Sequence, residues 1–202
     1  MPEERPFAHA ALVLAAGGSS RMGGAKQLLV LEGRTLLART LEAVSASGAH
    51  PIAIVLGSNA AAIRSQISEG SALVVINPDW ASGMASSIRS GISALTAAAP
   101  SLEAILVTPC DQPALTADSI RRLVGLHRST GLIAAARYSG RLGAPAVFGA
   151  GNLGALLALK GDEGARSLLN SGMVAVAGAD LPEFGFDIDT PADYQAWRSA
   201  HP

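Results

Sequence analysis

Six short apolar runs, separated by segments with helical periodicity, constrain the fold of this chain more than any other feature. The runs are "ALVLAA" (11–16), "IAIVLG" (52–57), "ALVVIN" (72–77), "AILVTPC" (104–110), "LIAAARY" (132–138) and "APAVFG" (144–149). Helices are expected at 34–47, 59–68, 84–97, 116–129, 152–158, 163–171 and 191–199. Continuous apolar strands that alternate with helices are typical of a parallel sheet with both faces covered. We therefore predict an α/β fold, a three-layer α/β/α sandwich around a mainly parallel sheet.

The chain is expected to form one domain over residues 1–202, with residues 1–9 as a flexible N-terminal tail. Its 202 residues are enough for one sizeable core. No repeat with a period of 20–50 residues and no low-complexity linker divides the sequence. A single domain is thus the simplest organisation.

Composition excludes several classes of protein. With 49% hydrophobic and 15% charged residues, the chain is not a disordered one, and it has no apolar run of about 18 residues that would suggest a membrane span. The start, "MPEERPFAHA", does not resemble a secretory signal, so we expect a soluble, cytoplasmic protein. A net charge of -1 predicts no general attraction to nucleic acid or membranes. The single cysteine, Cys110, excludes an internal disulfide and is expected in the core.

A loop rich in glycine and serine follows the first apolar run and spans Gly17 to Lys26. It contains no G-x-G-x-x-G dinucleotide motif, and it is not a P-loop because Gly24, not lysine, follows Gly23. Its backbone N–H groups, together with the charges of Arg21 and Lys26, suit an anion with several phosphates. The loop therefore predicts a nucleoside triphosphate site, and the alternative is an ordinary flexible turn.

Three aspartates occupy places suited to binding a metal ion. Asp111 follows the fourth apolar run, and "FDIDTP" contributes Asp187 and Asp189, which we expect at a strand end before a helix capped by Thr190. Mg²⁺ takes one or two carboxylates together with phosphate oxygens and water. The alternative for each aspartate is an Asx-turn or a helix cap. Because residues i and i+2 share a face of a strand, periodicity does not choose between Asp187 and Asp189.

The stretch "LAAGGSSRMGGAKQLL" resembles the signature L-A-A-G-x-x-x-R-M-G-x-x-K of the MobA-like nucleotidyltransferases, which implies a Rossmann-like nucleotide-diphospho transferase fold. Ala25 stands where a proline is usual, which should loosen the turn. The resemblance implies that Arg21 and Lys26 are catalytic and that Asp111 and Asp189 hold Mg²⁺. The nucleotide-binding residues that it implies in this loop are Ala15, Ala16, Gly17, Gly18, Ser19, Ser20, Arg21 and Lys26.

A second stretch, "NPDWASGMASSIRSGI", resembles the molybdenum cofactor cytidylyltransferases, with Ile88 in place of leucine. This favours cytosine over guanine, adds Gly83 and Ser87 to the nucleotide site, and gives Trp80 and Met84 apolar contacts at the acceptor site. "RLGAPAVFG" and "LKGDEGARSLL" resemble further motifs of these enzymes, and they imply that Gly143, Pro145, Asp162 and Arg166 bind the acceptor. The alternatives are that Met84 belongs to a helix core stripe, that Asp162 caps a helix and that Arg166 is solvated.

The resemblance implies transfer of CMP from CTP to the terminal phosphate of molybdopterin, with a molybdenum hydroxylase as the recipient of the product. Three alternatives remain open: a guanylyltransferase, a methylerythritol phosphate cytidylyltransferase, and a non-catalytic protein that binds the nucleotide or the cofactor. An oxidoreductase gains no support, because the dinucleotide motif is missing.

Overall fold

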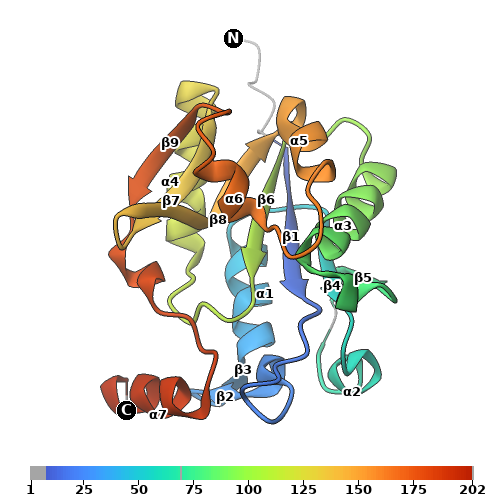
Figure 1. Ribbon diagram of the computed structural model, residues 1–202, viewed down its shortest axis with the longest axis vertical. Coiled ribbons are helices and arrows are strands. Elements are labelled where there is room, and N and C mark those ends of the chain that lie inside the picture. Colours follow the sequence, from blue (N-terminus) through green and yellow to red (C-terminus); the bar gives the residue numbers. More distant parts are fainter. Residues whose placement is uncertain (1–7, 69, 202) are drawn as a thin grey trace.

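The computed structural model describes residues 8–68 and 70–201, which form an α/β/α sandwich (Figure 1). A seven-stranded sheet has the order β5-β4-β1-β6-β8-β7-β9, and β8 is antiparallel to both of its neighbours while the other pairings are parallel. The strands are β1 (His9–Ala15), β4 (Ile52–Leu56), β5 (Leu73–Ile76), β6 (Ala104–Pro109), β7 (Ile133–Tyr138), β8 (Arg141–Gly149) and β9 (Val176–Asp180). A small hairpin consists of β2 (Val30–Leu31) and β3 (Arg34–Thr35). The predicted fold class is confirmed.

Helices cover both faces of the sheet. They are α1 (Leu36–Ala46), α2 (Ala60–Arg64), α3 (Met84–Ala98), α4 (Ala117–Thr130), α5 (Leu153–Leu157), α6 (Ala165–Leu169) and α7 (Pro191–Ala200). Short 3₁₀ turns are η1 (Lys26–Leu28), η2 (Trp80–Ser82), η3 (Ala150–Asn152) and η4 (Pro182–Gly185). Among the described residues, no helix combines the length and the apolar character needed to cross a membrane.

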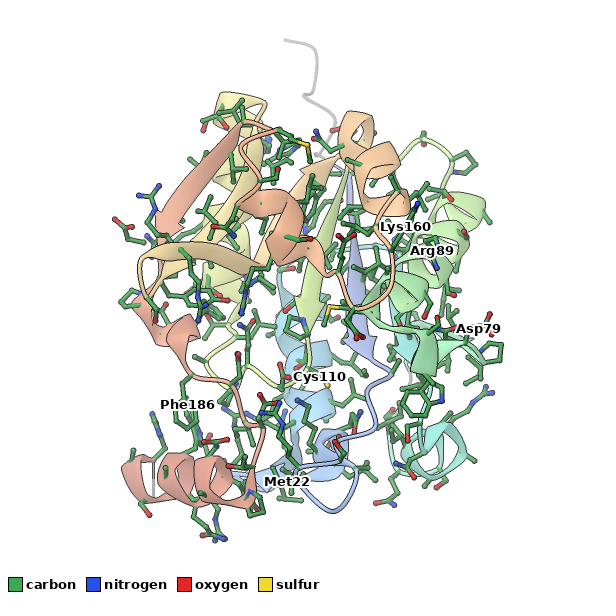
Figure 2. All side chains as sticks on the ribbon, viewed as in Figure 1. Met22, Asp79, Arg89, Cys110, Lys160 and Phe186 are labelled. Atoms are coloured by element: carbon green, nitrogen blue, oxygen red, sulfur yellow. The ribbon has the colours of Figure 1, made fainter. Side chains whose placement is uncertain are left out.

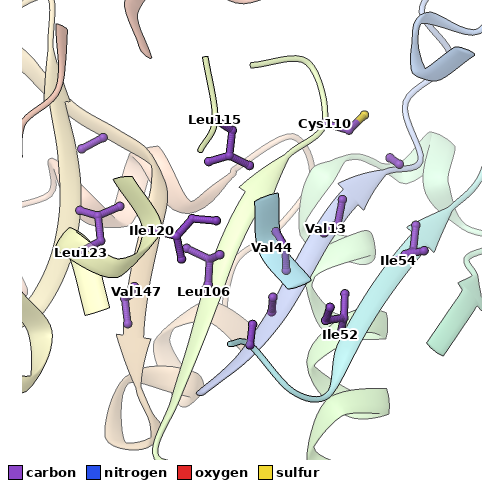
Figure 3. Packing of buried hydrophobic residues seen from close by; sticks show 14 of the residues in the cluster. Val13, Val44, Ile52, Ile54, Leu106, Cys110, Leu115, Ile120, Leu123 and Val147 are labelled. Carbon is purple, nitrogen blue, oxygen red and sulfur yellow. The ribbon is translucent and has the colours of Figure 1, made fainter. Parts of the chain in front are cut away.

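Side chains alternate along the strands, so each central strand contributes to two cores. On one face, Val13 and Leu106 pack with Val44 of α1 and Ile120 of α4, as Figure 3 shows. On the other face, the side chains of Leu12, Val55 and Val107 pack against α3, α5 and α6. Continuous apolar strands are thus explained by burial on both sides.

A third, smaller core holds α7 against the β2–β3 hairpin. Leu31, Leu36 and Ile188 are buried there, and Met22 and Trp197 pack against them. Figure 2 shows Met22 beside α7, at the lower end of the molecule. The glycine-rich loop, through Met22, and α7, through Trp197, therefore contact the same small core.

Several predicted boundaries differ from the structure. Residues 1–7 of the expected tail lie outside the described residues, but His9 is buried and begins β1, so the tail prediction is wrong at that residue. The first helix begins at Leu36, because Thr35 caps it while pairing with Val30. The second ends at Arg64 rather than 68.

The end of the last apolar region also differs from expectation. The six predicted apolar runs do not complete the sheet, because its far edge is β9, for which the sequence analysis contains no strand. Asp187 and Asp189 are not at a strand end: η4 separates them from β9, and they lie in an irregular segment before α7. The cap that Thr190 provides for α7 is confirmed, because its Oγ1 accepts a hydrogen bond from the Asp193 N–H at 3.2 Å.

Candidate active site

Two adjoining cavities lie beyond the carboxyl ends of β1 and β6. These strands are paired in parallel, so the loop after Ala15 and the turn after Pro109 emerge at the same edge of the sheet. The loop cavity, of about 340 Å³, is bordered by the glycine-rich loop, η2 and the start of α3. The Arg166 cavity, of about 480 Å³, is bordered by β8, α6 and the segment before α7. The residues that line both cavities are Leu14, Lys26, Met84, Pro109, Asp111 and Asp162.

Lys26 stands at the boundary between the two cavities. Its Nζ lies 2.5 Å from Oδ2 of Asp111 and 2.7 Å from Oδ1 of Asp189, and only 14% of its side chain is exposed. The two carboxylates belong to segments that are 78 residues apart in the sequence. One ammonium group thus joins the loop, the end of β6 and the approach to α7.

Charge pairing fixes the ionisation of this cluster. Burial by itself would lower the pKa of Lys26, but the charges of Asp111 and Asp189 outweigh it and raise that pKa above its ordinary value. Burial would likewise raise the pKa of Asp189, but its hydrogen bond with Lys26 and the charge of Arg21 bring it below the usual range. Lys26 therefore stays cationic and Asp189 anionic around neutral pH.

Arg21 is the second cation of the loop and is far more exposed than Lys26. Its Nη2 lies 3.0 Å from Oδ2 of Asp189, while 69% of its side chain is exposed. It also lines the Arg166 cavity. Exposed ion pairs are weak, so Arg21 can turn toward a ligand at little cost.

Gln27 is a functional candidate that the sequence analysis did not include. It is 1% exposed, and its Nε2 donates to the carbonyls of Ala15 at 2.8 Å and Gly17 at 3.1 Å. Next to it, the Lys26 N–H donates to Oγ of Ser19 at 3.2 Å, and Ser19 has a φ of 51°. These hydrogen bonds hold the first half of the loop next to the segment that carries Lys26. Its signal in the sequence is a polar residue in the apolar context "KQLLV".

Trp80 packs against the glycine-rich loop. A Cβ at Gly18 would lie 3.3 Å from its ring, and a Cβ at Gly57 would lie 2.5 Å from the Trp80 Cβ. Trp80 lines the loop cavity and not the Arg166 cavity, although the sequence analysis assigned it to the acceptor. The two glycines provide the room for the indole, which closes one side of the loop cavity.

The segment between α5 and α6 is held against the start of α3. A Cβ at Gly83, where φ is 113°, would come within 2.2 Å of the backbone of Gly161, and the Ala85 N–H donates to the Gly161 carbonyl at 3.1 Å. Arg89 adds a hydrogen bond to the Leu159 carbonyl at 2.7 Å; Figure 2 shows its side chain beside this segment. The positive φ and the close approach of the two backbones explain why position 83 is a glycine. The same contact places Asp162 where it lines both cavities.

A polar network forms one wall of the Arg166 cavity. Nη2 of Arg166 lies 3.3 Å from the hydroxyl of Tyr138, which donates to the Ala144 carbonyl at 3.2 Å. Nε2 of Gln112 donates to the same carbonyl at 3.0 Å. A Cβ at Gly143 would lie 2.1 Å from the Tyr138 hydroxyl, so Gly143 leaves space for the ring.

Asp187 lines the Arg166 cavity next to the charged cluster. Burial raises the pKa of its carboxyl, and the negative charge of Asp111 adds to this. Its Oδ1 is buried and has no hydrogen-bond partner within the described residues. The Asp189 carboxylate, in contrast, is paired with the cations of Lys26 and Arg21.

The structure brings together most of the residues that the sequence analysis selected, but not all. Ala15, Ala16, Gly17, Lys26, Gly83, Met84 and Ser87 line the loop cavity, and Arg21, Lys26, Asp111, Asp162, Arg166 and Asp189 line the Arg166 cavity. The residues that line neither of these two cavities are Gly18, Ser19, Ser20, Gly143 and Pro145. Gly18 lies against Trp80 instead, and Gly143 lies against Tyr138.

Cys110 is buried, as expected, and is one of the residues that line the loop cavity. Burial raises the pKa of its thiol to about 12, so it stays protonated and is a poor nucleophile.

Comparisons with known proteins agree with this architecture. Residues 11–177 match the family model described as the MobA-like NTP transferase domain. The chain is 37% identical over 190 residues to nicotine blue oxidoreductase of Paenarthrobacter nicotinovorans, which covers 89% of this chain and 91% of that protein. It is 31% identical over 200 residues to purine catabolism protein PucB of Bacillus subtilis, covering 93% and 94%.

Solved structures include a similar protein, Rv0371c of Mycobacterium tuberculosis H37Rv. Its crystal structure superimposes with a TM-score of 0.81 and 28% identity, covering 96% of this chain and 99% of that one. A second crystal structure of Rv0371c is a complex with manganese. Since the family model spans most of the sheet and both strands that carry the site, the chain belongs to the MobA-like NTP transferase family.

Proposed function

We propose that this protein is a cytidylyltransferase that transfers CMP from CTP to the terminal phosphate of molybdopterin and releases pyrophosphate. The position of Lys26 is the observation that carries this proposal. A lysine at the boundary of two cavities can contact a nucleotide phosphate from one side and an acceptor phosphate from the other. In this reading the loop cavity takes CTP and the Arg166 cavity takes the acceptor.

The chemistry needs positioning and charge neutralisation more than proton transfer. An acceptor phosphate is already ionised near neutral pH, so its oxygen attacks the α-phosphorus in line, a new P–O bond forms, and pyrophosphate leaves with the electrons of the broken bond. Lys26 and Arg21 oppose the negative charge that develops, and the loop N–H groups hold the leaving phosphates. The raised pKa of Lys26 supports this role, because the group keeps its charge.

Asp111 and Asp189 are the residues that would hold Mg²⁺, which neutralises phosphate charge when bound. The donor set fits: both side chains are carboxylates, they meet at one ammonium group, and the lowered pKa of Asp189 leaves it ionised. No group of three or more His, Cys, Asp or Glu side chains suited to a metal ion occurs among residues 8–68 and 70–201. A site with two carboxylates leaves the remaining positions to phosphate and water, as Mg²⁺ prefers.

A pyrophosphate-release assay tests the proposal directly. The purified chain is mixed with Mg²⁺, molybdopterin and one of CTP, GTP, ATP or UTP. We expect release with CTP and molybdopterin together, and none after metal chelation. Release with GTP alone among the nucleotides would instead identify a guanylyltransferase. Selective binding of CTP without release under any condition would identify a non-catalytic protein.

A second candidate is an oxidoreductase, which the 37% identity to nicotine blue oxidoreductase favours. The glycine-rich loop has no dinucleotide motif, and the buried thiol of Cys110 does not favour thiol redox chemistry. The test is to supply an oxidised aromatic heterocycle with NADH or NADPH and no nucleoside triphosphate. Consumption of the reduced cofactor would support the oxidoreductase over the transferase.

A further inference from the structure

A buried asparagine at the end of β5 has a side chain whose orientation is fixed. Asn77 is 2% exposed, and its Oδ1 accepts a hydrogen bond from the Asp79 N–H at 3.0 Å. A backbone N–H can only donate, so the atom that faces it must be the amide oxygen. The amide nitrogen of Asn77 therefore points the opposite way, toward the start of α3.

That nitrogen donates to two serine hydroxyls. Nδ2 of Asn77 lies 2.9 Å from Oγ of Ser86 and 3.0 Å from Oγ of Ser87. Ser86 passes its own hydrogen on to the protein, because its Oγ lies 2.8 Å from the Gly83 carbonyl and 3.0 Å from the Asp79 carbonyl. Within the described residues, Ser87 donates no hydrogen bond.

Ser87 is 4% exposed, and it lines the loop cavity. A hydroxyl carries one hydrogen, and an amide NH₂ group cannot accept it. Because Asn77 occupies a lone pair of the Ser87 oxygen, the Ser87 hydrogen points away from Asn77. Residues 8–68 and 70–201 provide no hydrogen-bond acceptor for it, so the loop cavity that Ser87 lines is the place where it can be used. Ser87 thus presents a donor to whatever occupies the loop cavity.

We propose that Asn77 is a specificity-determining positioning residue: it makes Ser87 a donor that selects a nucleobase with acceptor atoms at the facing edge. This inference rests on the proposed function, in which the loop cavity holds the base of CTP. Cytosine has two adjacent acceptors, O2 and N3, which can accept the Ser87 hydrogen. At the corresponding edge guanine has N1–H and a 2-amino group, which are donors and cannot accept it. The Asn77–Ser87 pair therefore favours CTP over GTP.

The variant Asn77→Asp reverses the polarity of this pair with little change in shape. Its carboxylate still accepts from the Asp79 N–H, but it also accepts from the serine hydroxyls, so the Ser87 hydrogen turns toward it and the cavity meets oxygen lone pairs. We expect the ratio of the CTP and GTP dissociation constants, measured by titration calorimetry with Mg²⁺, to shift against CTP by about tenfold. An unchanged ratio in a folded variant would overturn the proposal.

Three further variants separate positioning from a purely structural role. Ser86→Ala removes the neighbouring hydroxyl, which the protein itself uses, and should leave the nucleotide ratio unchanged. Asn77→Asp combined with Ser87→Ala should show the same ratio as Ser87→Ala alone, because Asn77 acts through Ser87. If the double variant loses further selectivity, Asn77 acts on the base by another route and the proposal fails.

Changing the nucleotide keeps the test independent of how well Asn77→Asp folds. Wild-type protein is titrated with CTP, with 3-deaza-CTP, which lacks the N3 acceptor, and with 2-thio-CTP, whose sulfur accepts weakly. We expect about a tenfold loss of affinity for at least one analogue, and no such loss in Ser87→Ala. Equal losses in both proteins, or none in wild type, would overturn the inference. Because binding is measured here, failure of pyrophosphate release would count only against the proposed function.

Discussion

At the scale of single residues, Lys26 and Gln27 are neighbours with different tasks. Lys26 places its charge between Asp111 and Asp189, while Gln27 is buried and uses its amide to hold two loop carbonyls. The first residue can oppose charge on the reacting phosphates, and the second fixes the shape of the loop that would bind them. Their substitution should therefore affect different kinetic parameters.

Lys26→Ala should lower turnover by about 100-fold or more, since it removes the half-buried cation at the boundary of the cavities. The matched control is Lys160→Ala, which removes an exposed lysine that lines neither cavity. Steady-state pyrophosphate release with CTP and molybdopterin, with circular dichroism to check folding, provides the measurement. Near-normal turnover of the Lys26 variant would contradict the assigned role.

Gln27→Leu keeps the volume of the side chain but removes the donor to the Ala15 and Gly17 carbonyls. We expect the KM for CTP to rise by about tenfold while kcat changes less, because the loop loses its preset shape but Lys26 remains. The control is Gln66→Leu, an exposed site outside both cavities. A drop in kcat with unchanged KM would argue against a loop-positioning role.

At the scale of elements, α7 brings Asp189 to the site. Thr190 caps this helix in a reciprocal pair with Asp193, and the same pairing occurs at the start of α4 between Thr116 and Ser119. The two caps are thus locally similar, but only the first lies beside a residue of the charged cluster. This makes them a natural matched pair.

Thr190→Ala and Thr116→Ala should each lower the free energy of unfolding by about 1 kcal/mol. Only Thr190→Ala should also slow pyrophosphate release, because it loosens the segment that holds Asp189. Urea denaturation and initial-rate measurements on both variants check this. Equal effects on rate would show that the position of Asp189 does not depend on the α7 cap.

The α7 cap should also respond to acid. The hydrogen bond from the Thr190 hydroxyl lowers the pKa of Asp193, and the backbone N–H groups of Thr190 and Asp189 add to this. A folded-state pKa below the unfolded value means that the stabilisation is complete above about pH 4 and is lost as the pH falls through the folded pKa. Asp193→Asn should thus be less stable than wild type at pH 7, and the difference should shrink toward pH 2 in urea titrations.

At the scale of the whole molecule, the layers approach closely where α3 crosses the sheet. A Cβ at Gly91 of α3 would lie 2.1 Å from Cδ1 of Leu12 and 2.9 Å from Cγ2 of Val55. A Cβ at Gly125 of α4 would have no neighbour within 4 Å. Two glycines in helix interiors therefore differ only in what packs against them.

Gly91→Ala should lower the free energy of unfolding by about 1–3 kcal/mol, because the methyl group overpacks the core. Gly125→Ala should raise it by about 0.5–1 kcal/mol, since alanine is the better helix former and the space is open. Thermal and urea unfolding of both variants measure this. Stabilisation by both substitutions would mean that α3 can move away from β1 without loss.

The sequence by itself determined the layered fold and the glycine-rich loop, because these depend on local patterns. Apolar runs such as "IAIVLG" reflect burial on both faces, and the order of glycines, Arg21 and Lys26 is readable along the chain. β9 was missed because its residues are only partly buried and form an edge, so the run "VAGAD" lacks the apolar strength of the central strands.

Only the tertiary structure decided which of these residues meet. Asp111 and Asp189 reach the same ammonium group because parallel pairing of β1 with β6 and docking of α7 on the β2–β3 hairpin bring distant segments to one edge of the sheet. The buried roles of Gln27 and Asn77, and the place of Trp80 over the loop, likewise depend on hydrogen bonds and packing between segments. Such contacts have no period in the sequence, since they are set by how the layers pack.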